Sequence, residues 1–309
     1  QAKANSRVGI LVGFSKAVRF SLQVLILGAG AWLVLEQKGT PGGMIAASII
    51  MGRALAPVEQ AIGTWRNFVN SRTAFYRLET LLDKYTDASQ TVSLPRPKGY
   101  LAVERLFASP PNSKTPVLKG VNFELNPGDS LAIIGPSAAG KTTLARLLVG
   151  VWPPLQGHVR LDGADVYQWS ATERGPYVGY VPQDVELFSG TVAENIARFG
   201  EADSASIIAA AKLAGCHELI LNLPQGYETR IGDGGGFLSG GQRQRVALAR
   251  AVFGVPPFIV LDEPDSNLDS SGQMALLETL IRLKQLNSTV VLIAQNSRII
   301  DNVDKVLLL

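Results

Sequence analysis

The chain has 309 residues, a formal net charge of +3 and one cysteine, Cys216. This length predicts two domains, a single cysteine excludes an internal disulfide, and so mild a charge gives no support for nucleic-acid binding. Apolar residues make up 46% of the chain and the mean hydropathy is +0.16, which is high for a purely soluble protein and points to membrane segments.

Two uncharged runs lie near the start of the chain, at residues 20–35 and 39–52. Each is shorter than the ~20 residues that cross a bilayer core, so two buried core helices are the alternative. Small residues in both runs would let membrane helices pack closely. Basic residues precede the first run and follow the second, whereas the loop between them is nearly neutral. This distribution predicts two membrane spans with both flanks in the cytoplasm.

A stretch rich in threonine, serine and proline, residues 85–99, separates the first part of the chain from the rest. From residue 54 to about 83 the pattern stays helical but becomes polar, which indicates a membrane helix that continues into the cytoplasm. We predict the C-terminal part of a transmembrane domain at 1–83, a linker at 84–99 and a second domain at 100–309. Because the chain starts at Gln1 and ends in an apparent strand, 305–309, we expect a piece of a longer protein.

A glycine-rich stretch at 135–143 fits the phosphate-loop pattern G-x-x-x-x-G-K-[ST]. An apolar strand at 130–134 precedes it and a helical pattern at 144–149 follows, which is the order that anion binding by such a loop requires. Lys141 would reach the β- and γ-phosphates, and the Thr142 hydroxyl would ligate Mg²⁺. The predicted nucleotide-binding residues of the loop are Gly135, Pro136, Ser137, Ala138, Ala139, Gly140, Lys141, Thr142 and Thr143.

Two later motifs place polar groups at the ends of elements. Gln183 follows an apolar strand and could ligate Mg²⁺ or hold the attacking water, with a solvated strand-end side chain as the alternative. A helix begins after Leu238-Ser239-Gly240-Gly241-Gln242. Glycines and a serine at a helix start form an anion site, although ordinary helix capping explains the same residues.

A further apolar strand, 258–262, delivers two adjacent acids to its tip. Two buried carboxylates cost desolvation energy unless a cation and a substrate use them. Asp262 would hold Mg²⁺ through water, and Glu263 would polarise the attacking water. Asp269 follows in a turn and is a further nucleotide-binding candidate, with capping of the next helix as the alternative.

Taken together and in this order, these motifs resemble the nucleotide-binding domain of ATP-binding cassette (ABC) transporters. Residues 44–60 also look like the last membrane helix of type I protein-secretion exporters of the protease-exporting branch, and 229–234 is similar to the exporter segment that senses the membrane domain. The expected fold class is an α/β P-loop nucleotide-binding domain preceded by all-α transmembrane helices. If so, the first four of the usual six membrane helices lie outside this chain.

The resemblance implies an ATP-driven exporter that uses ATP and Mg²⁺. Two nucleotide-binding domains would face head to tail in a homodimer, with each ATP between the phosphate loop of one subunit and Ser239, Gly241 and Gln242 of the other. The implied location is the bacterial inner membrane, in contact with membrane lipid, with the nucleotide-binding domain in the cytoplasm. Implied partners are a periplasmic adaptor protein, an outer-membrane channel and a secreted, unfolded protein with a C-terminal signal. No nucleic acid is expected.

This chain departs from the family pattern at three places. Ala138 and Ala139 stand where glycine and serine are usual. At the position expected to stack on adenine, about 25 residues before the loop, this chain has Ala108-Ser109-Pro110-Pro111 and no aromatic residue, and Phe107 is the nearby candidate. Gln295 replaces the histidine that contacts the γ-phosphate, which keeps an N–H donor but cannot carry positive charge. The two histidines, His158 and His217, are expected at the surface or in packing.

Three other functions fit parts of the pattern. An exporter of lipid or drug keeps the fold and changes the cargo. A soluble cassette ATPase acting on nucleic acid or ribosomes would require that residues 1–83 are not embedded in a membrane. An inactive, ATP-binding scaffold is suggested by Gln295.

Overall fold

The computed structural model describes residues 2–86, 94–111, 115–294 and 297–309. It divides the chain into two units, Gln1–Gln90 and Thr91–Leu309, and the boundary between them falls within the predicted linker.

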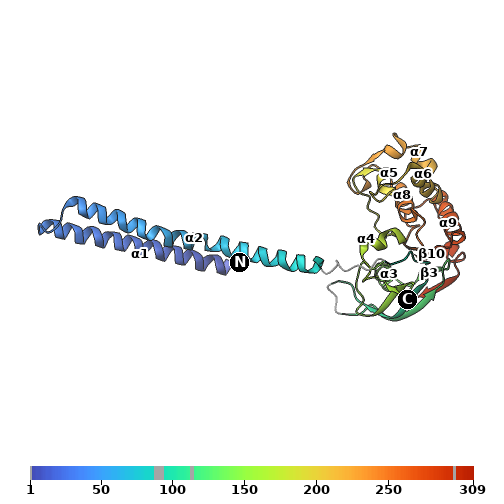
Figure 1. Ribbon diagram of the computed structural model, residues 1–309, viewed down its shortest axis with the longest axis horizontal. Helices are drawn as coiled ribbons and strands as arrows, with labels where there is room; N and C mark the ends of the chain where they lie inside the picture. The colour runs from blue at the N-terminus through green and yellow to red at the C-terminus, as the bar shows by residue number, and fades with distance from the viewer. Residues whose placement is uncertain (1, 87–93, 112–114, 295–296) are drawn as a thin grey trace. The chain divides into compact units, whose positions relative to one another are not determined.

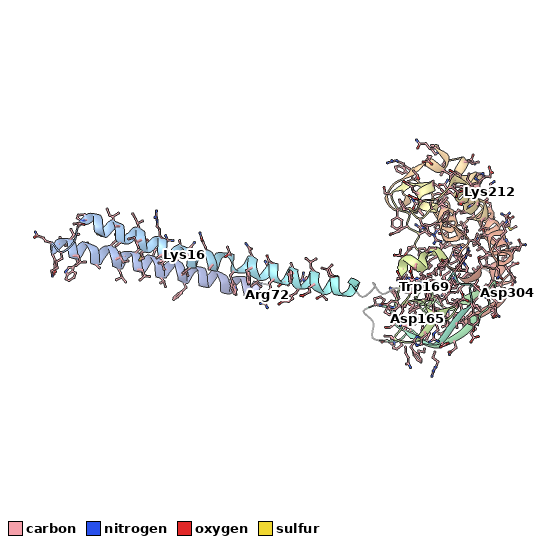
Figure 2. The ribbon with its side chains drawn as sticks, in the orientation of Figure 1. Lys16, Arg72, Asp165, Trp169, Lys212 and Asp304 are labelled. Atoms are coloured by element: carbon pink, nitrogen blue, oxygen red, sulfur yellow. The ribbon has the colours of Figure 1, made fainter. Side chains whose placement is uncertain are left out.

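The first unit is a hairpin of two helices, α1 (Ala2–Leu35) and α2 (Pro41–Thr86), which lie side by side (Figure 1). Gly30 permits close packing, since a Cβ at this position would lie 2.5 Å from the Cγ of Met44. Side chains project outward along both helices, as Figure 2 shows for Lys16 and Arg72.

Two segments of the hairpin are long and apolar enough to cross a membrane, judged by length and composition. They are Gly13–Leu35, with a mean hydropathy of 1.8, and Pro41–Val58, with 1.3. The first contains the whole predicted run 20–35, and the second contains all of the run 39–52 except its first two residues. Within the described residues, no part of either apolar window is buried.

The predicted linker, 84–99, is divided between the two units. Residues 84–86 are the last turn of α2. The other end is attached to the second unit, because the N–H groups of Lys98 and Gly99 donate to Oδ2 of Asp162 at 2.7 and 2.9 Å. Gly99 has φ 107° and no room for a side chain, since a Cβ would lie 2.7 Å from the carbonyl oxygen of Pro257.

The second unit is built on a five-stranded parallel sheet with the strand order β11-β3-β10-β9-β6. Its strands are β3 (Ser130–Ile134), β6 (Val178–Val181), β9 (Phe258–Asp262), β10 (Thr289–Ile293) and β11 (Lys305–Leu308). The central strands are continuous apolar runs because both sheet faces are covered. The helix α3 (Lys141–Leu148) packs on one face, and α8 (Gly240–Val252) and α9 (Ser270–Gln285) pack on the other.

A four-stranded antiparallel sheet, ordered β2-β1-β4-β5, packs on the α3 side. Its strands are β1 (Leu101–Ala108), β2 (Leu118–Leu125), β4 (Gln156–Leu161) and β5 (Ala164–Asp165). One face of β1 buries Leu101, Val103 and Leu106 against α3, which joins the two sheets into one core.

A mainly helical part lies between β6 and β9 in the sequence and gathers at one end of the unit (Figure 1, yellow to orange). It comprises β7 (Gly190–Thr191), α5 (Val192–Ile196), α6 (Ser204–Leu213), α7 (His217–Leu221), η3 (Gly226–Glu228), β8 (Arg230–Ile231), η4 (Asp233–Gly235) and α8. The remaining short helices are α4 (Ala171–Arg174), η2 (Gly175–Tyr177) and α10 (Ser297–Ile300).

The cysteine and the two histidines have packing or surface environments, as expected. Cys216 is buried in the core of the helical part, and burial raises the pKa of its thiol to about 12. The Nδ1 atom of His217 lies 2.9 Å from the Tyr227 hydroxyl. His158 is half-exposed and lies beside Asp165, with 3.1 Å between Nδ1 and Oδ2.

Candidate functional site

The phosphate loop connects β3 to α3, as the sequence predicts. Gly140 precedes the helix with φ 98°, and a Cβ there would lie 2.7 Å from Cγ1 of Val117 and 2.9 Å from Cδ2 of Leu118. Only glycine fits this position. Ala138 also has a left-handed backbone, with φ 65°, which costs a non-glycine residue about 1–2 kcal/mol.

Lys141 is the first residue of α3, and its side chain is held inside the loop. The Nζ atom donates to the carbonyl oxygens of Gly135 at 2.8 Å and Pro136 at 2.9 Å. The residue is 7% exposed, so its charge is largely shielded from water. A buried ammonium group at a helix start, surrounded by loop N–H groups, forms a binding site for a phosphate.

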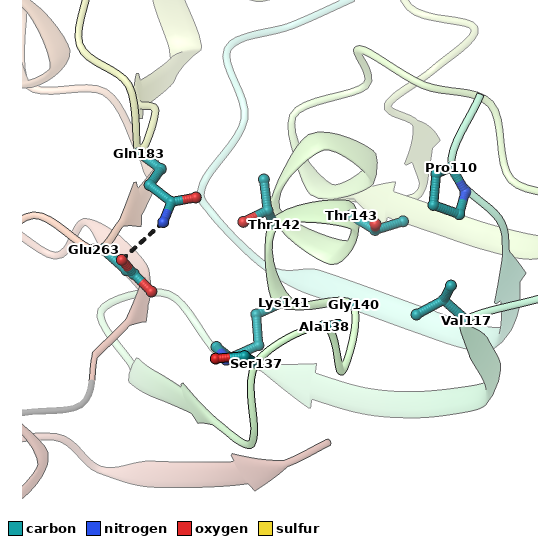
Figure 3. A pocket seen from close by; sticks show the side chains of 10 residues that line it. All are labelled: Pro110, Val117, Ser137, Ala138, Gly140, Lys141, Thr142, Thr143, Gln183 and Glu263. Atoms are coloured by element: carbon teal, nitrogen blue, oxygen red, sulfur yellow. Dashed lines mark hydrogen bonds between the residues drawn. The ribbon is translucent and has the colours of Figure 1, made fainter. Parts of the chain in front are cut away.

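A cavity of about 370 Å³ opens over this loop (Figure 3). Four segments line it: the loop, the strand ends after β6 and β9, and the connection between β1 and β2. The lining residues are Pro110, Val117, Ser137, Ala138, Gly140, Lys141, Thr142, Thr143, Gln183 and Glu263. The structure therefore brings Lys141, Gln183 and Glu263 to one place.

Gln183 and Glu263 lie next to each other on one side of the cavity. The Nε2 atom of Gln183 donates to Oε2 of Glu263 at 2.9 Å, shown as a dashed line in Figure 3. The two residues are far apart in sequence, but β6 and β9 are parallel neighbours, so their carboxyl ends meet at one edge of the sheet. Glu263 itself has φ 48°, and its N–H donates to the carbonyl of Ile293 at 3.1 Å.

Asp262 ends β9 and is fully buried. Within the part of the chain that the structure describes, neither of its carboxylate oxygens has a hydrogen-bond partner. Burial raises its pKa to about 6, and the nearby Thr142 hydroxyl, together with the charges of Arg146 and Lys141, counteracts part of that rise.

This environment fits a bound divalent cation. An unpaired buried carboxylate is costly, and Mg²⁺ prefers carboxylate, hydroxyl and amide oxygens. Thr142 and Asp262 are close enough for the threonine hydroxyl to lower the pKa of the carboxyl group, and Gln183 lies at the same edge of the sheet. These are the three residues that the sequence selects as metal ligands.

The residues predicted to form an anion site at a helix start, Ser239 to Gln242, lie at the start of α8. Ser239 and Gln242 make a reciprocal capping box: Oγ of Ser239 accepts from the Gln242 N–H at 3.2 Å, and Oε1 of Gln242 accepts from the Ser239 N–H at 2.9 Å. Gly240 and Gly241 are the first two residues of the helix. The side chains of Ser239 and Gln242 thus cap the helix in this chain, which is the alternative stated for them above.

Asp269 is also a capping residue, at the N-terminus of α9. Its Oδ1 atom accepts from the Gly272 N–H and from Nη2 of Arg245, both at 2.8 Å. Among the residues described, the lining of the cavity contains none of Ser239, Gly240, Gly241, Gln242 and Asp269. It also leaves out Gly135, Pro136, Ala139 and the buried Asp262.

Two further residues, Pro110 and Val117, line the cavity: Pro110 belongs to the stretch 108–111 at the position expected to stack on adenine, and Val117 was missed by the sequence analysis. The candidate that was put forward, Phe107, does not line the cavity. It lies on β1 with its ring next to Gly120, where a Cβ would be 3.5 Å from Cζ of the phenylalanine. An isolated valine carries no sequence signal for nucleotide binding, so only the fold reveals Val117. Gln295 lies outside the described residues.

Comparisons with known proteins agree with this geometry. The sequence profile described as "ABC transporter" matches residues 118–266. The type I secretion system ATP-binding protein PrsD of Rhizobium meliloti is 49% identical over 296 residues, which are 96% of this chain and 51% of that protein. The leukotoxin translocation ATP-binding protein LktB of Mannheimia haemolytica is 34% identical over 94% of this chain and 41% of its own length.

A solved structure of a bacterial Atm1-family ABC exporter with ATP bound matches all of this chain and 54% of its own chain, with a TM-score of 0.78 and 28% identity. The expected fold class is confirmed by this match and by the family profile. The chain spans about half, or less, of the length of the relatives that it matches.

Proposed function

The chain belongs to the ABC transporter family, and from this premise we propose that it is the C-terminal part of an exporter subunit that uses ATP to move an unfolded protein across the bacterial inner membrane. The observation that carries the proposal is the cavity in which Lys141, Gln183 and Glu263 meet. The names of two relatives, a type I secretion ATP-binding protein and a leukotoxin translocation protein, favour protein as the cargo. Neither a lipid nor a drug cargo has comparable support.

The nucleotide-binding domain binds ATP, and the loop geometry suggests how. The triphosphate would accept hydrogen bonds from the loop N–H groups. The Lys141 ammonium would then donate to the β- and γ-phosphates instead of to the carbonyl oxygens of Gly135 and Pro136. Loop residues 135–143 would form the main anion site. We propose that Thr142, Gln183 and Asp262 hold Mg²⁺, which neutralises charge on the phosphates when it is bound.

Glu263 is the proposed general base. In the structure, Oε2 of its carboxylate accepts a hydrogen bond from Gln183. Movement of the Gln183 side chain to the proposed Mg²⁺ site would free this oxygen to hold the attacking water. General-base assistance of this kind contributes about 10²–10⁴-fold to a rate. Gln295 is proposed, from sequence alone, to donate a neutral hydrogen bond to the γ-phosphate.

The remaining predicted nucleotide contacts require a second copy of the chain. We propose that Ser239, Gly240, Gly241, Gln242 and Asp269 act on ATP held by the partner subunit's loop, because they lie outside the cavity of their own chain. The hairpin would lie in the membrane lipid and the second unit in the cytoplasm. A periplasmic adaptor protein and an outer-membrane channel complete the proposed export path.

The ATPase assignment is tested with the 309-residue chain in detergent. Glu263→Gln should retain ATP binding and lose at least about 100-fold in hydrolysis, because only the water-polarising group is removed. Lys141→Ala should lose binding. Glu278→Gln, an exposed change on α9, is the matched control and should hydrolyse ATP like the parent. Hydrolysis by Glu263→Gln at the parental rate would refute the assignment.

The cargo class is tested in native membranes that contain the chain. ATP hydrolysis there should rise when an unfolded protein with its C-terminal signal is added, and should not rise when the signal is deleted. Stimulation of ATP hydrolysis by a lipid or a drug, and not by the protein, would identify the chain as part of a lipid or drug exporter.

A further inference from the structure

A tyrosine that the proposed mechanism does not use lies behind Asp262. In the pairing of β6 with β9, Tyr180 is opposite Val260 and Val181 is opposite Leu261. Side chains alternate between the two faces of a strand. Tyr180, Val260 and Asp262 therefore share one face of the sheet, the face that α3 covers, whereas Val181 and Leu261 pack in the cluster on the other face.

Tyr180 and Asp262 have complementary polar groups that are both buried without partners. The Tyr180 hydroxyl has no hydrogen bond within the described residues, and neither carboxylate oxygen of Asp262 has one. Tyr180 is opposite Val260, so Asp262, two residues farther along β9, is its diagonal neighbour on the same sheet face, within reach of a tyrosine side chain. Burial, and then the negative charge of Asp262, raise the pKa of Tyr180. A hydroxyl can donate where an ionised carboxylate can only accept.

Arg146 completes the cluster from α3. It lies four residues after Thr142 and so is on the same side of the helix. Its guanidinium is held over the Trp152 ring, 4.6 Å from the ring centroid. The charge of Arg146 lowers the pKa of both Tyr180 and Asp262.

We propose that Tyr180 is a positioning residue for the divalent cation, and that its hydroxyl donates to the Asp262 carboxylate and accepts from Arg146. This rests on the proposed role of Asp262 as a metal ligand. The hydroxyl fixes the orientation in which Asp262 presents its oxygens, because a carboxylate without a fixed partner rotates freely about its last bond. Partners behind metal ligands typically account for about 10–100-fold in metal affinity.

A packing role for Tyr180 makes a different prediction. If only the packing of the ring stabilises the fold, the hydroxyl is a buried polar group without a hydrogen bond to any described residue and contributes nothing to stability. Replacement by phenylalanine would then be neutral or stabilising and would leave cation binding unchanged.

The test uses Mn²⁺ as the probe ion and the Glu263→Gln chain, which is expected not to turn over ATP. Free Mn²⁺ is measured by electron paramagnetic resonance in detergent, with the chain in molar excess over ATP so that the nucleotide is bound to the protein. Adding Tyr180→Phe should weaken Mn²⁺ binding about 10-fold and leave ATP binding in EDTA unchanged. Tyr227→Phe removes a hydroxyl that hydrogen-bonds His217 in the helical part, and should leave both affinities unchanged. An unchanged Mn²⁺ affinity in Tyr180→Phe would overturn the proposal.

A double-variant cycle tests whether Tyr180 acts through Asp262. In an Asp262→Asn background, Tyr180→Phe should change the weakened Mn²⁺ affinity by no more than about twofold, because the group to be oriented is gone. A full 10-fold effect in that background would also overturn the proposal. If the Glu263→Gln chain bound no Mn²⁺ with ATP, the proposed nucleotide site itself would be refuted, and the role of Tyr180 with it.

Discussion

Ala138 is a strained residue of the phosphate loop, with φ 65°. We predict that Ala138→Gly raises the free energy of unfolding by about 0.5–1 kcal/mol, since relief of the left-handed strain exceeds the extra entropy of glycine in the unfolded chain. Thermal unfolding of the chain in the absence of added nucleotide measures this change in the free energy of unfolding. Ala139→Gly is the matched control: Ala139 has no positive φ, so this change should be destabilising. Equal destabilisation by both changes would contradict the prediction.

The wall of the cavity formed by Pro110 and Val117 has no aromatic ring. Stacking of a nucleobase on an aromatic side chain is worth about 1–3 kcal/mol. Pro110→Tyr should therefore tighten ATP binding at least about fivefold, as measured by competition with a fluorescent nucleotide. Pro111→Tyr is the control, because Pro111 is exposed and absent from the lining. Unchanged affinity in Pro110→Tyr would mean that the base binds elsewhere.

At the scale of elements, α2 carries a charge within its apolar segment. Arg53 lies 12 residues after the first residue of the helix, Pro41, or about 18 Å along it and inside a core of ~30 Å. A lipid-facing arginine would cost about 2.5–3.5 kcal/mol. We therefore predict that Arg53 faces a water-filled path.

Cysteine labelling in native membranes checks this prediction. Arg53→Cys should react with a charged thiol reagent that does not enter lipid. The parent chain is a clean control, because the native Cys216 is buried and burial raises the pKa of its thiol. Reaction of position 53 with lipid-soluble reagents alone would show that Arg53 faces lipid or the membrane surface.

At the scale of the whole molecule, the loop cavity and the cap of α8 are separate sites in one copy of the chain. If the cap of one copy completes the cavity of the other, as proposed, a chain with a defective loop and a chain with a defective cap should together form one intact site. Lys141→Ala and Ser239→Gly should each abolish hydrolysis, whereas a mixture should recover about a quarter of the parental rate. Random pairing makes half of the dimers mixed, and each mixed dimer has one intact site out of two. Glycine preserves most of the capping preference at position 239, so folding is retained. A mixture as inactive as its components would argue against a shared site.

The sequence by itself determined the elements whose signals are local. The strand at 130–134, the loop with its glycines and the helix from Lys141 follow one another within 19 residues, so their order in the chain is already their order in space. The strand that ends in Asp262 and the two apolar helices were predictable for the same reason. A continuous apolar run of strand or helix length indicates burial or a membrane without reference to distant residues.

Only the tertiary structure decided which distant residues meet. Gln183 reaches Glu263 because β6 is the neighbour of β9, and strand order depends on packing of the whole sheet, not on any local pattern. The same packing brings Pro110 and Val117 to the cavity, puts Phe107 out of it, and makes Tyr180 and Asp262 diagonal neighbours on one sheet face. Residues 94–99 look like linker because their composition is that of a loop, yet hydrogen bonds to Asp162, 63 and 64 residues away, tie them to the second unit.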